Sequence, residues 1–198
     1  MIIVSKLKLA FMHVPKTGGS SITAALMPYL GQPNGPTSGN GWQIPHHMQG
    51  YDMHSAFFHY KWEKPDDEWR TFAVVREPFD RMHSYYTNNK KPGQSFVEWL
   101  KESAESNVLR HRMSQFNLIQ KDGQVGVDVV IPFENLSEGL ATLGIQLPEK
   151  RINVGNRTRE QMLAAYEKEP EAVDLVRSMA GRDFEEFGYA TDLECLQR

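Results

Sequence analysis

The chain has 198 residues, of which 40% are apolar and 24% charged, and its formal net charge at pH 7 is -3. This length favours one domain with a sizeable core, and the composition is that of a soluble globular protein, not of a disordered one. The charge argues against general binding to nucleic acid or anionic membranes, which usually needs a basic excess. It stays compatible with a local positive pocket for a small anion.

Cys195 is the only cysteine, so no intrachain disulfide can form, which fits a reducing compartment. The apolar run from Leu7 to Val14 is short and stops at a Pro-Lys-Thr turn, unlike a signal sequence. No stretch reaches the roughly 20 apolar residues that a membrane helix needs. We therefore expect a soluble, cytoplasmic protein with no integral membrane segment.

The first predicted elements form a strand, a turn and a helix. The apolar run Leu7–His13 predicts a buried strand, which ends at Pro15 and the glycines that follow. An apolar run over Ile22–Leu30 predicts a helix. This order is typical of the opening of an α/β nucleotide-binding unit. Gly31–Gly50 is rich in Gly, Pro, Asn, Ser and Gln, which predicts a long loop of the kind that is usually functional or mobile.

The rest of the chain predicts two more buried strands separated by helices. The strands are Thr71–Val75 and Val127–Ile131. The helices are expected at Phe79–Asn88 after Pro78, around Phe96–Leu100, over Leu136–Leu143 closing at Gly144, from the capping box Thr158/Gln161 toward Glu167, after Pro170, and at Asp183–Phe187. With no internal repeat and no linker, residues 1–198 predict a single α/β domain with a small parallel sheet.

The turn from Pro15 to Ser21 predicts an anion site. Gly18 and Gly19 let backbone N–H groups point inward, and the following helix adds unpaired N–H groups and the positive end of its dipole. Lys16 supplies a full charge. The alternative is an ordinary glycine turn with a solvated lysine. A Walker A loop does not fit, because there the lysine follows the glycines, whereas here it precedes them.

A second motif begins at Arg76, at the carboxyl end of a predicted strand, where α/β sheets place ligand-binding groups. Ser84 lies two turns into the following helix, so the two side chains can converge on one anion. Arg81 is expected to brace the loop through an acid such as Asp80 or Glu77. Read alone, an arginine at a strand end is more often part of a surface ion pair.

Together, the two motifs resemble those of the membrane-type and carbohydrate sulfotransferase family. The first, Pro-Lys-Thr-Gly-Gly-Ser-Ser, is similar to that family's Pro-Lys-Thr-Gly-Gly-Thr-Ser loop. The second, Val-Arg-Glu-Pro with a later Arg and Ser-Tyr-Tyr, is similar to its Val-Arg-Asn/Asp-Pro motif. Weaker similarities cover most of the remaining chain, at Ser114–Leu118, Phe133–Leu136 and Asp183–Tyr189. Ser20 replaces the usual threonine and keeps its hydroxyl, and the chain is near the family's minimum length.

The resemblance implies a P-loop-like, three-layer α/β/α fold with a small central parallel sheet. It also implies a sulfuryl donor, 3′-phosphoadenosine 5′-phosphosulfate (PAPS). Its 5′-phosphosulfate would be held by Lys16, Thr17, Gly18, Gly19, Ser20 and Ser21, and its 3′-phosphate by Arg76 and Ser84. Lys16 would act on the leaving group, and no metal is required.

Transfer to a hydroxyl needs a base near the acceptor. Met53–Tyr60 resembles the His-x-x-Phe segment that carries the base in uronosyl 2-O-sulfotransferases, which places the base on His54, with His59 as second choice. Glu63 and Glu68 are alternatives, since other branches of the family use a carboxylate. Either histidine could instead be a buried core residue, or could bind a metal with His46 and His47, although no cysteine or spaced acid completes the set.

Two arginines, the acceptor and the type of reaction each allow more than one interpretation. Arg157 and Arg159 lie where related enzymes close a basic loop over the donor, but a solvated pair at a helix start explains them as well. The acceptor is a small molecule or a glycan that the sequence does not identify. An atypical P-loop kinase of small molecules and a non-catalytic nucleotide- or glycan-binding module are the alternative functions.

Overall fold

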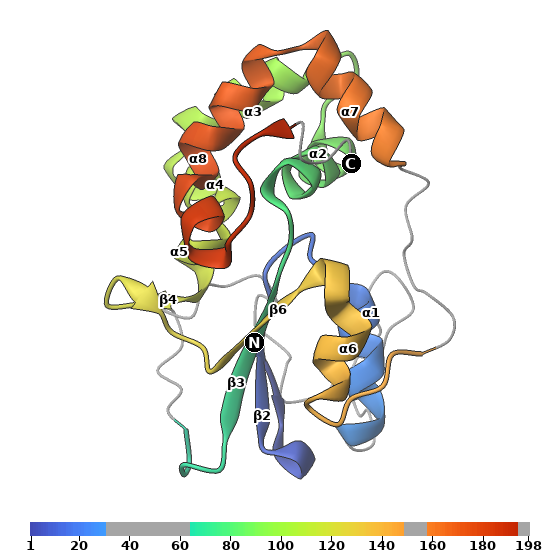
Figure 1. Ribbon diagram of the computed structural model, residues 1–198, viewed down its shortest axis with the longest axis vertical. Helices are drawn as coiled ribbons and strands as arrows, with labels where there is room; N and C mark the ends of the chain where they lie inside the picture. The colour runs from blue at the N-terminus through green and yellow to red at the C-terminus, as the bar shows by residue number, and fades with distance from the viewer. Residues whose placement is uncertain (31–63, 149–157, 194–198) are drawn as a thin grey trace.

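The computed structural model describes residues 1–30, 64–148 and 158–193. At its centre is a four-stranded sheet with the order β1-β2-β3-β6 (Figure 1). β1 (Ile2–Val4) pairs antiparallel with β2 (Leu9–Met12), whereas β2, β3 (Arg70–Val75) and β6 (Val129–Pro132) run parallel to one another. The predicted α/β class with a small parallel sheet is thus confirmed by β2, β3 and β6, to which β1 adds an antiparallel strand. β1 was not predicted, because three residues are too few for a periodic pattern.

The parallel register aligns the ends of the three parallel strands β2, β3 and β6. Met12 of β2 lies opposite Ala73 of β3, and Val75 of β3 lies opposite Pro132 of β6. The loop after β2, the turn after β3 and the segment after β6 therefore leave the sheet at one edge. In open α/β sheets this edge is where ligands bind.

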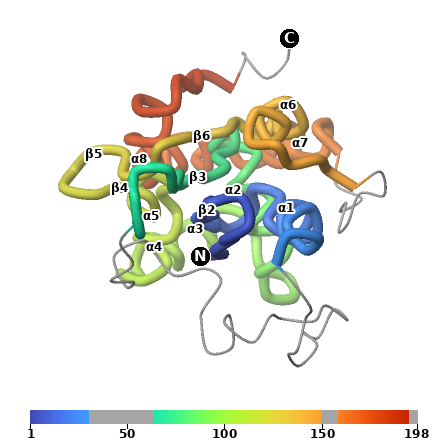
Figure 2. Tube along the Cα trace, turned by 90° about the horizontal axis from the view of Figure 1, so that it is seen from below, coloured from blue at the N-terminus to red at the C-terminus, as the bar shows by residue number. Residues whose placement is uncertain are grey.

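Alternate side chains of the strands face opposite layers, as the two-residue period of a strand requires. One face packs on α1 (Gly19–Leu26) and α6 (Leu136–Ala141). The other face packs on α5 (Gln115–Ile119) and residues near the chain end. Figure 2 shows α1 and α6 on one side of the strands, and α5 with the hairpin β4 (Gln120–Lys121)–β5 (Gln124–Val125) on the other.

A helical part with its own core lies beyond the carboxyl ends of β3 and β6 (Figure 1). This core contains several aromatic rings, among them those of Phe79, Phe96, Tyr166 and Phe184. The Phe79 ring packs edge-on against Tyr166, with 5.4 Å between the ring centroids. The helices are α2 (Pro78–Asn89), α3 (Phe96–Glu105), α4 (Asn107–Met113), α7 (Arg159–Lys168) and α8 (Glu171–Phe187).

Most predicted elements are present with shifted ends. The helix expected at Ile22–Leu30 begins at Gly19 and ends at Leu26, followed by a 3-10 turn. The capping box of Thr158 and Gln161 is confirmed at the start of α7. The last short helix expected at Asp183–Phe187 is present as the final part of α8, which the non-helical backbone of Ala180 (φ -114°, ψ 20°) separates by a kink from the helix that follows Pro170. α4, α5 and the β4–β5 hairpin were not predicted; each is too short for a clear pattern.

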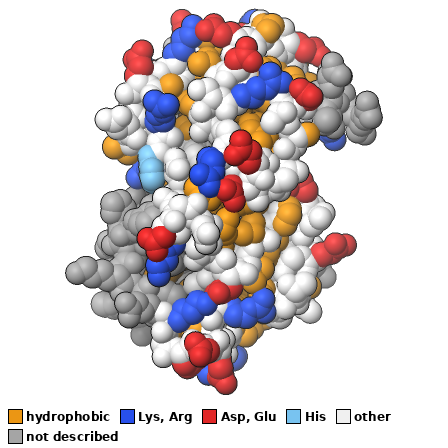
Figure 3. Space-filling model, turned by 60° about the vertical axis from the view of Figure 1, so that its left-hand side comes forward, with side chains coloured by type: hydrophobic (Ala, Val, Ile, Leu, Met, Phe, Trp, Pro, Cys, Tyr) orange, Lys and Arg blue, Asp and Glu red, His pale blue; other side chains and the backbone are white. Residues whose placement is uncertain are grey.

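Within the described ranges, no helix is both long and apolar enough to cross a bilayer. On the face drawn in Figure 3, Lys and Arg side chains are interspersed with Asp and Glu over the described surface. Exposed ion pairs of the described surface include those of Lys91 with Glu102 at 2.5 Å and of Lys101 with Glu171 at 2.8 Å. Exposed pairs of this kind contribute little to stability.

Candidate active site

The loop between β2 and α1 is compact and has two left-handed residues. Lys16 has φ 70° and Gly18 has φ 80°. The buried Thr17 hydroxyl donates to the Val14 carbonyl at 2.8 Å, which closes the loop on itself. Gly18 is the N-cap of α1, and its carbonyl accepts from the backbone N–H groups of Ser21 and Ile22. The predicted loop thus leads directly into the amino end of a helix.

Two arginines bind backbone carbonyls of the loop. Arg76 Nη1 donates to the Lys16 carbonyl at 3.2 Å, and Arg81 Nε donates to the Pro15 carbonyl at 3.0 Å. In a trans peptide the C=O and the N–H point in opposite directions. The N–H groups of Lys16 and Thr17 therefore point away from the arginines. This arrangement of backbone donors suits an anion.

The two glycines of the loop allow close packing of aromatic rings. A Cβ on Gly18 would lie 2.8 Å from a ring carbon of Phe133, and the positive φ of Gly18 disfavours a side chain in any case. A Cβ on Gly19 would lie 1.8 Å from His13 Nε2. The glycines are therefore required by packing as well as by any anion. The ring of His13, at the end of the predicted strand, supports the loop at Gly19, and no motif in the sequence marks this role.

Arg76, after β3, is held on several sides. Its Nε donates to Asp80 Oδ2 at 2.7 Å, and its Nη2 forms an ion pair with the same carboxylate. The Phe133 ring lies over the guanidinium, with its centroid 4.4 Å from Cζ. With the bond to Lys16, these contacts use the Nε–H and one N–H of each terminal nitrogen, so each terminal nitrogen keeps a second N–H. Paired terminal N–H groups suit two oxygens of a phosphate.

Arg81 braces the loop as expected, but not through the expected partner. Asp80 pairs with Arg76 instead, while the fully buried Arg81 donates to three carbonyls, those of Pro15, Arg112 and Met113. Burial lowers the pKa of Arg81, and the buried carboxylate of Asp183 opposes this effect. Arg81 therefore joins the loop to the end of α4.

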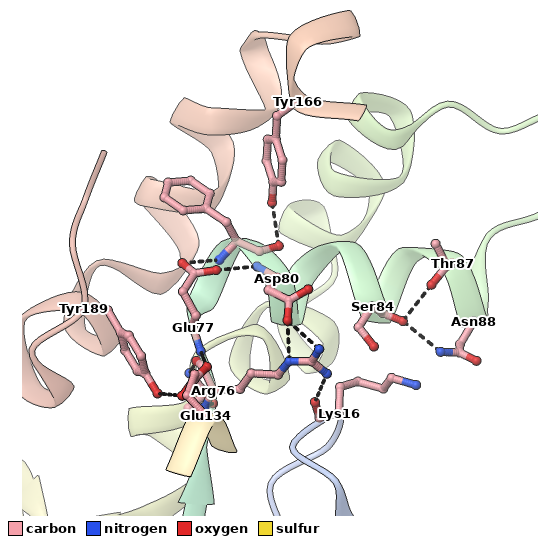
Figure 4. A network of polar contacts seen from close by, with 12 residues as sticks. Lys16, Arg76, Glu77, Asp80, Ser84, Thr87, Asn88, Glu134, Tyr166 and Tyr189 are labelled. Atoms are coloured by element: carbon pink, nitrogen blue, oxygen red, sulfur yellow. Dashed lines mark hydrogen bonds and ion pairs between the residues drawn. The ribbon is translucent and has the colours of Figure 1, made fainter. Parts of the chain in front are cut away.

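Lys16, Arg76 and Ser84 are brought to one region. Figure 4 shows the three side chains along the side of α2 that faces the loop after β2. Ser84 is 8% exposed, and its carbonyl accepts from Thr87 Oγ1 and Asn88 Nδ2. Its place two turns into α2 is the one predicted.

Segments distant in sequence also meet at the turn between β3 and α2. Glu77 is the N-cap of α2 and accepts from the backbone N–H groups of Phe79 and Asp80. Glu134 Oε1 accepts from the Glu77 backbone N–H at 2.9 Å, and Tyr189 donates to Glu134 Oε2 at 2.9 Å (Figure 4).

The surroundings of Glu77 and Tyr189 shift the pKa values of their side chains. Burial raises the pKa of Glu77 to about 7, although the N–H groups of Asp80 and Phe79 lower it. Burial also raises the pKa of Tyr189, with a further contribution from Glu134. Of the segments with weaker similarity, Phe133–Leu136 and Asp183–Tyr189 thus contribute directly to this turn.

The candidate bases have different outcomes. His54, His59 and Glu63 lie outside the described residues, as does Arg157. Glu68 is exposed and pairs with Lys8 at the amino end of β3. The six-residue strand β3 separates it from the loop by roughly 20 Å, so Glu68 is not suited to be the base. Arg159 is the exposed first residue of α7.

Comparison with known protein families gives a match. A family model described as "Sulfotransferase family" matches residues 1–190. No curated protein and no solved structure gives a significant match. The family match spans the loop, the Arg76 turn and the segments that support them. The chain therefore belongs to the sulfotransferase family.

Proposed function

We propose that this sulfotransferase takes its sulfuryl group from PAPS and transfers it to a hydroxyl of an acceptor that is a carbohydrate, a small metabolite or a lipid. Lys16 and the loop through Ser21 would bind the 5′-phosphosulfate. Arg76 and Ser84 would bind the 3′-phosphate. This assignment follows the resemblance of both motifs, and the geometry of the described residues supports it.

The observation that carries the proposal is the direct link between the two anion sites. The guanidinium of Arg76 donates to the carbonyl of Lys16, so a second cation lies beside the phosphate loop. A loop for one phosphate would not need this second site. A nucleoside with phosphate groups at both its 3′ and 5′ positions would use both. ATP, the donor of the alternative kinase, has no 3′-phosphate.

The donor groups fit such a nucleotide chemically. Backbone N–H groups of the loop and the start of α1 would hold oxygens of the 5′ group, helped by the helix dipole. The second N–H groups on Arg76 Nη1 and Nη2 would hold the 3′-phosphate. The Asp80 carboxylate binds Nε and Nη2 of Arg76 and so fixes the orientation of the guanidinium group.

When bound, PAPS supplies a sulfuryl group whose bond to the phosphate oxygen breaks as a bond to the acceptor oxygen forms. Lys16 and the loop N–H groups would stabilise the charge that develops on the phosphate oxygen. Arg76 and Ser84 would fix the nucleotide and so orient the reacting atoms. His54 is our proposed base, which would take the proton of the acceptor hydroxyl.

The experiment is incubation of the full chain with radiolabelled PAPS and a panel of hydroxyl acceptors, followed by mass spectrometry of the products. We expect an acceptor heavier by one sulfuryl group, and expect His54→Ala to lose transfer while retaining the affinity for adenosine 3′,5′-bisphosphate (PAP). Equal transfer by His54→Ala would exclude His54 as the base. Phosphate transfer from ATP with Mg²⁺, and none from PAPS, would show a kinase instead.

A further inference from the structure

We propose that Gln115 is a positioning residue for Arg76, and that Asp183 holds Gln115 in place. The proposal rests on the proposed binding of a 3′-phosphate by Arg76. It concerns the backbone of Arg76, which no motif of the loop or of α2 explains. It would make α5 and α8 part of the machinery that selects the donor.

The first step is the contact itself. The side-chain amide of Gln115 makes two hydrogen bonds to the backbone of Arg76. Its Oε1 accepts from the Arg76 N–H at 2.8 Å, and its Nε2 donates to the Arg76 carbonyl at 2.8 Å. At the residue that follows β3, one side-chain amide thus makes the pair of backbone hydrogen bonds that a neighbouring strand makes within a sheet. Only a group with one donor and one acceptor at this spacing can satisfy both atoms.

The second step is the rigidity of Gln115. It is fully buried, and it is the first residue of α5, next to its N-cap Ser114. The carboxylate of Asp183, on α8, accepts from the backbone N–H groups of Gln115 at 2.8 Å and Phe116 at 2.9 Å, and from the Ser114 hydroxyl at 2.8 Å. Asp183 is itself fully buried. Asp183, on a helix distant in sequence, therefore fixes the backbone of Gln115 and with it the position from which the side-chain amide extends.

The third step is the effect on the guanidinium. The side-chain contacts of Arg76 with Asp80, the Lys16 carbonyl and Phe133 all require its Cα to be correctly placed. A change in the Arg76 backbone would alter these contacts together and would turn the remaining N–H groups away from a phosphate. Binding sites need first-contact groups held within small tolerances by their supporting residues. Gln115 does this at the backbone, and Asp80 does it at the side chain.

The test compares PAP with 5′-AMP, which differs by the 3′-phosphate, by isothermal titration. The main variant, Gln115→Met, keeps the length of the side chain and removes both hydrogen bonds. We expect its affinity for PAP to fall about 10-fold, the low end of the loss that follows removal of a partner that orients a metal ligand, and its affinity for 5′-AMP to change less than about 2-fold. Equal losses for the two nucleotides would mean a purely structural role and would overturn the proposal.

A matched control lies on the same helix. Asn117 is two residues away, is only partly buried, and its side chain makes no hydrogen bond within the part of the chain that is described. Asn117→Leu should leave both affinities unchanged. A fall in the preference for PAP in Asn117→Leu as large as in Gln115→Met would assign the effect to α5 in general and overturn the role of Gln115.

A further variant separates this proposal from the proposed function. Arg76→Met should abolish most of the preference for PAP over 5′-AMP. If Arg76→Met loses the preference and Gln115→Met keeps it, the positioning role alone is wrong. If Arg76→Met keeps the preference, the 3′-phosphate assignment is wrong and the positioning role with it.

A measurement on the wild-type chain covers the case in which Gln115→Met does not fold. The side-chain amide signals of Gln115 in a nitrogen–proton NMR spectrum should shift on addition of PAP and much less on addition of 5′-AMP. Equal shifts with both nucleotides, or none with PAP, would overturn the proposal without any substitution.

Discussion

The loop after β2 and the turn after β3 adjoin at one edge of the sheet, but they are held differently. The loop is local: residues 15–21 present backbone groups and are braced by Arg76 and Arg81 through carbonyls. The turn is held by side chains from α2, α5 and the segment after β6, and α8 supports α5 through Asp183. A loop of the first kind is visible in a short motif, whereas a turn of the second kind depends on the whole fold.

The strongest expected effect is that of replacing Arg81 of α2, which joins the loop to the end of α4. Arg81→Met would leave the carbonyls of Pro15, Arg112 and Met113 and the buried Asp183 without their cationic partner. We expect the free energy of unfolding to fall by about 3–5 kcal/mol in urea titrations. The exposed Arg110 on α4 is the control, and Arg110→Met should change it by less than about 0.5 kcal/mol. A similar small change in Arg81→Met would show that the loop does not depend on this brace.

Substitutions of Lys16 and of Arg76 should change different kinetic constants if the loop acts on the reaction and the turn on donor binding. Lys16→Met is expected to lower kcat roughly 100-fold to 1000-fold, as for the loss of one donor to a developing charge. Arg76→Met is expected to raise KM for PAPS about 10-fold to 100-fold, as for a lost hydrogen bond to a charged group, with a smaller change in kcat. Steady-state rates with an identified acceptor measure both. Matching effects of the two variants on kcat and KM would remove the distinction between the regions.

The turn should be more sensitive to pH than its surroundings, because of Glu77. Its pKa is raised to about 7, above the ordinary value of 4.5, so the folded chain keeps a proton that the unfolded chain releases between these values. The free energy of unfolding should therefore fall as pH rises through this window, by up to about 3 kcal/mol. Urea titrations from pH 5 to pH 8 should show a smaller fall for Glu77→Gln, while Glu105→Gln, on the exposed side of α3, should follow the wild type. An unchanged slope in Glu77→Gln would contradict the shift.

The smallest expected effect concerns the packing of the loop on His13. Gly19→Ala would place a methyl group in contact with the imidazole, and the free energy of unfolding should fall by about 1–3 kcal/mol. The double variant Gly19→Ala/His13→Ala should recover part of this loss, because the ring that meets the methyl group is absent. Circular dichroism melts of both variants measure the difference. No recovery in the double variant would show that the cost arises from the backbone and not from the ring.

The sequence predicted the parts of this site that depend on local patterns. The strand before Pro15, the glycine turn and the helix with Ser84 were found because each has its own periodicity or motif. The partner of Arg81 was mistaken, because nearness in sequence favoured Asp80 and Glu77, whereas the fold brings carbonyls from the loop and α4. Gln115, Glu134 and Asp183 lay in segments with recognised similarity, but their contacts with the turn follow only from the packing of helices distant in sequence.

The most direct test of the account is a crystal structure of the chain with PAP bound. We predict that the 3′-phosphate lies within hydrogen-bond distance of the terminal nitrogens of Arg76 and of Ser84 Oγ, and that the 5′-phosphate lies in the loop from Lys16 to Ser21. We also predict that Gln115 keeps both of its bonds to the Arg76 backbone. A 3′-phosphate that contacts neither Arg76 nor Ser84 would contradict the two-site description of the donor.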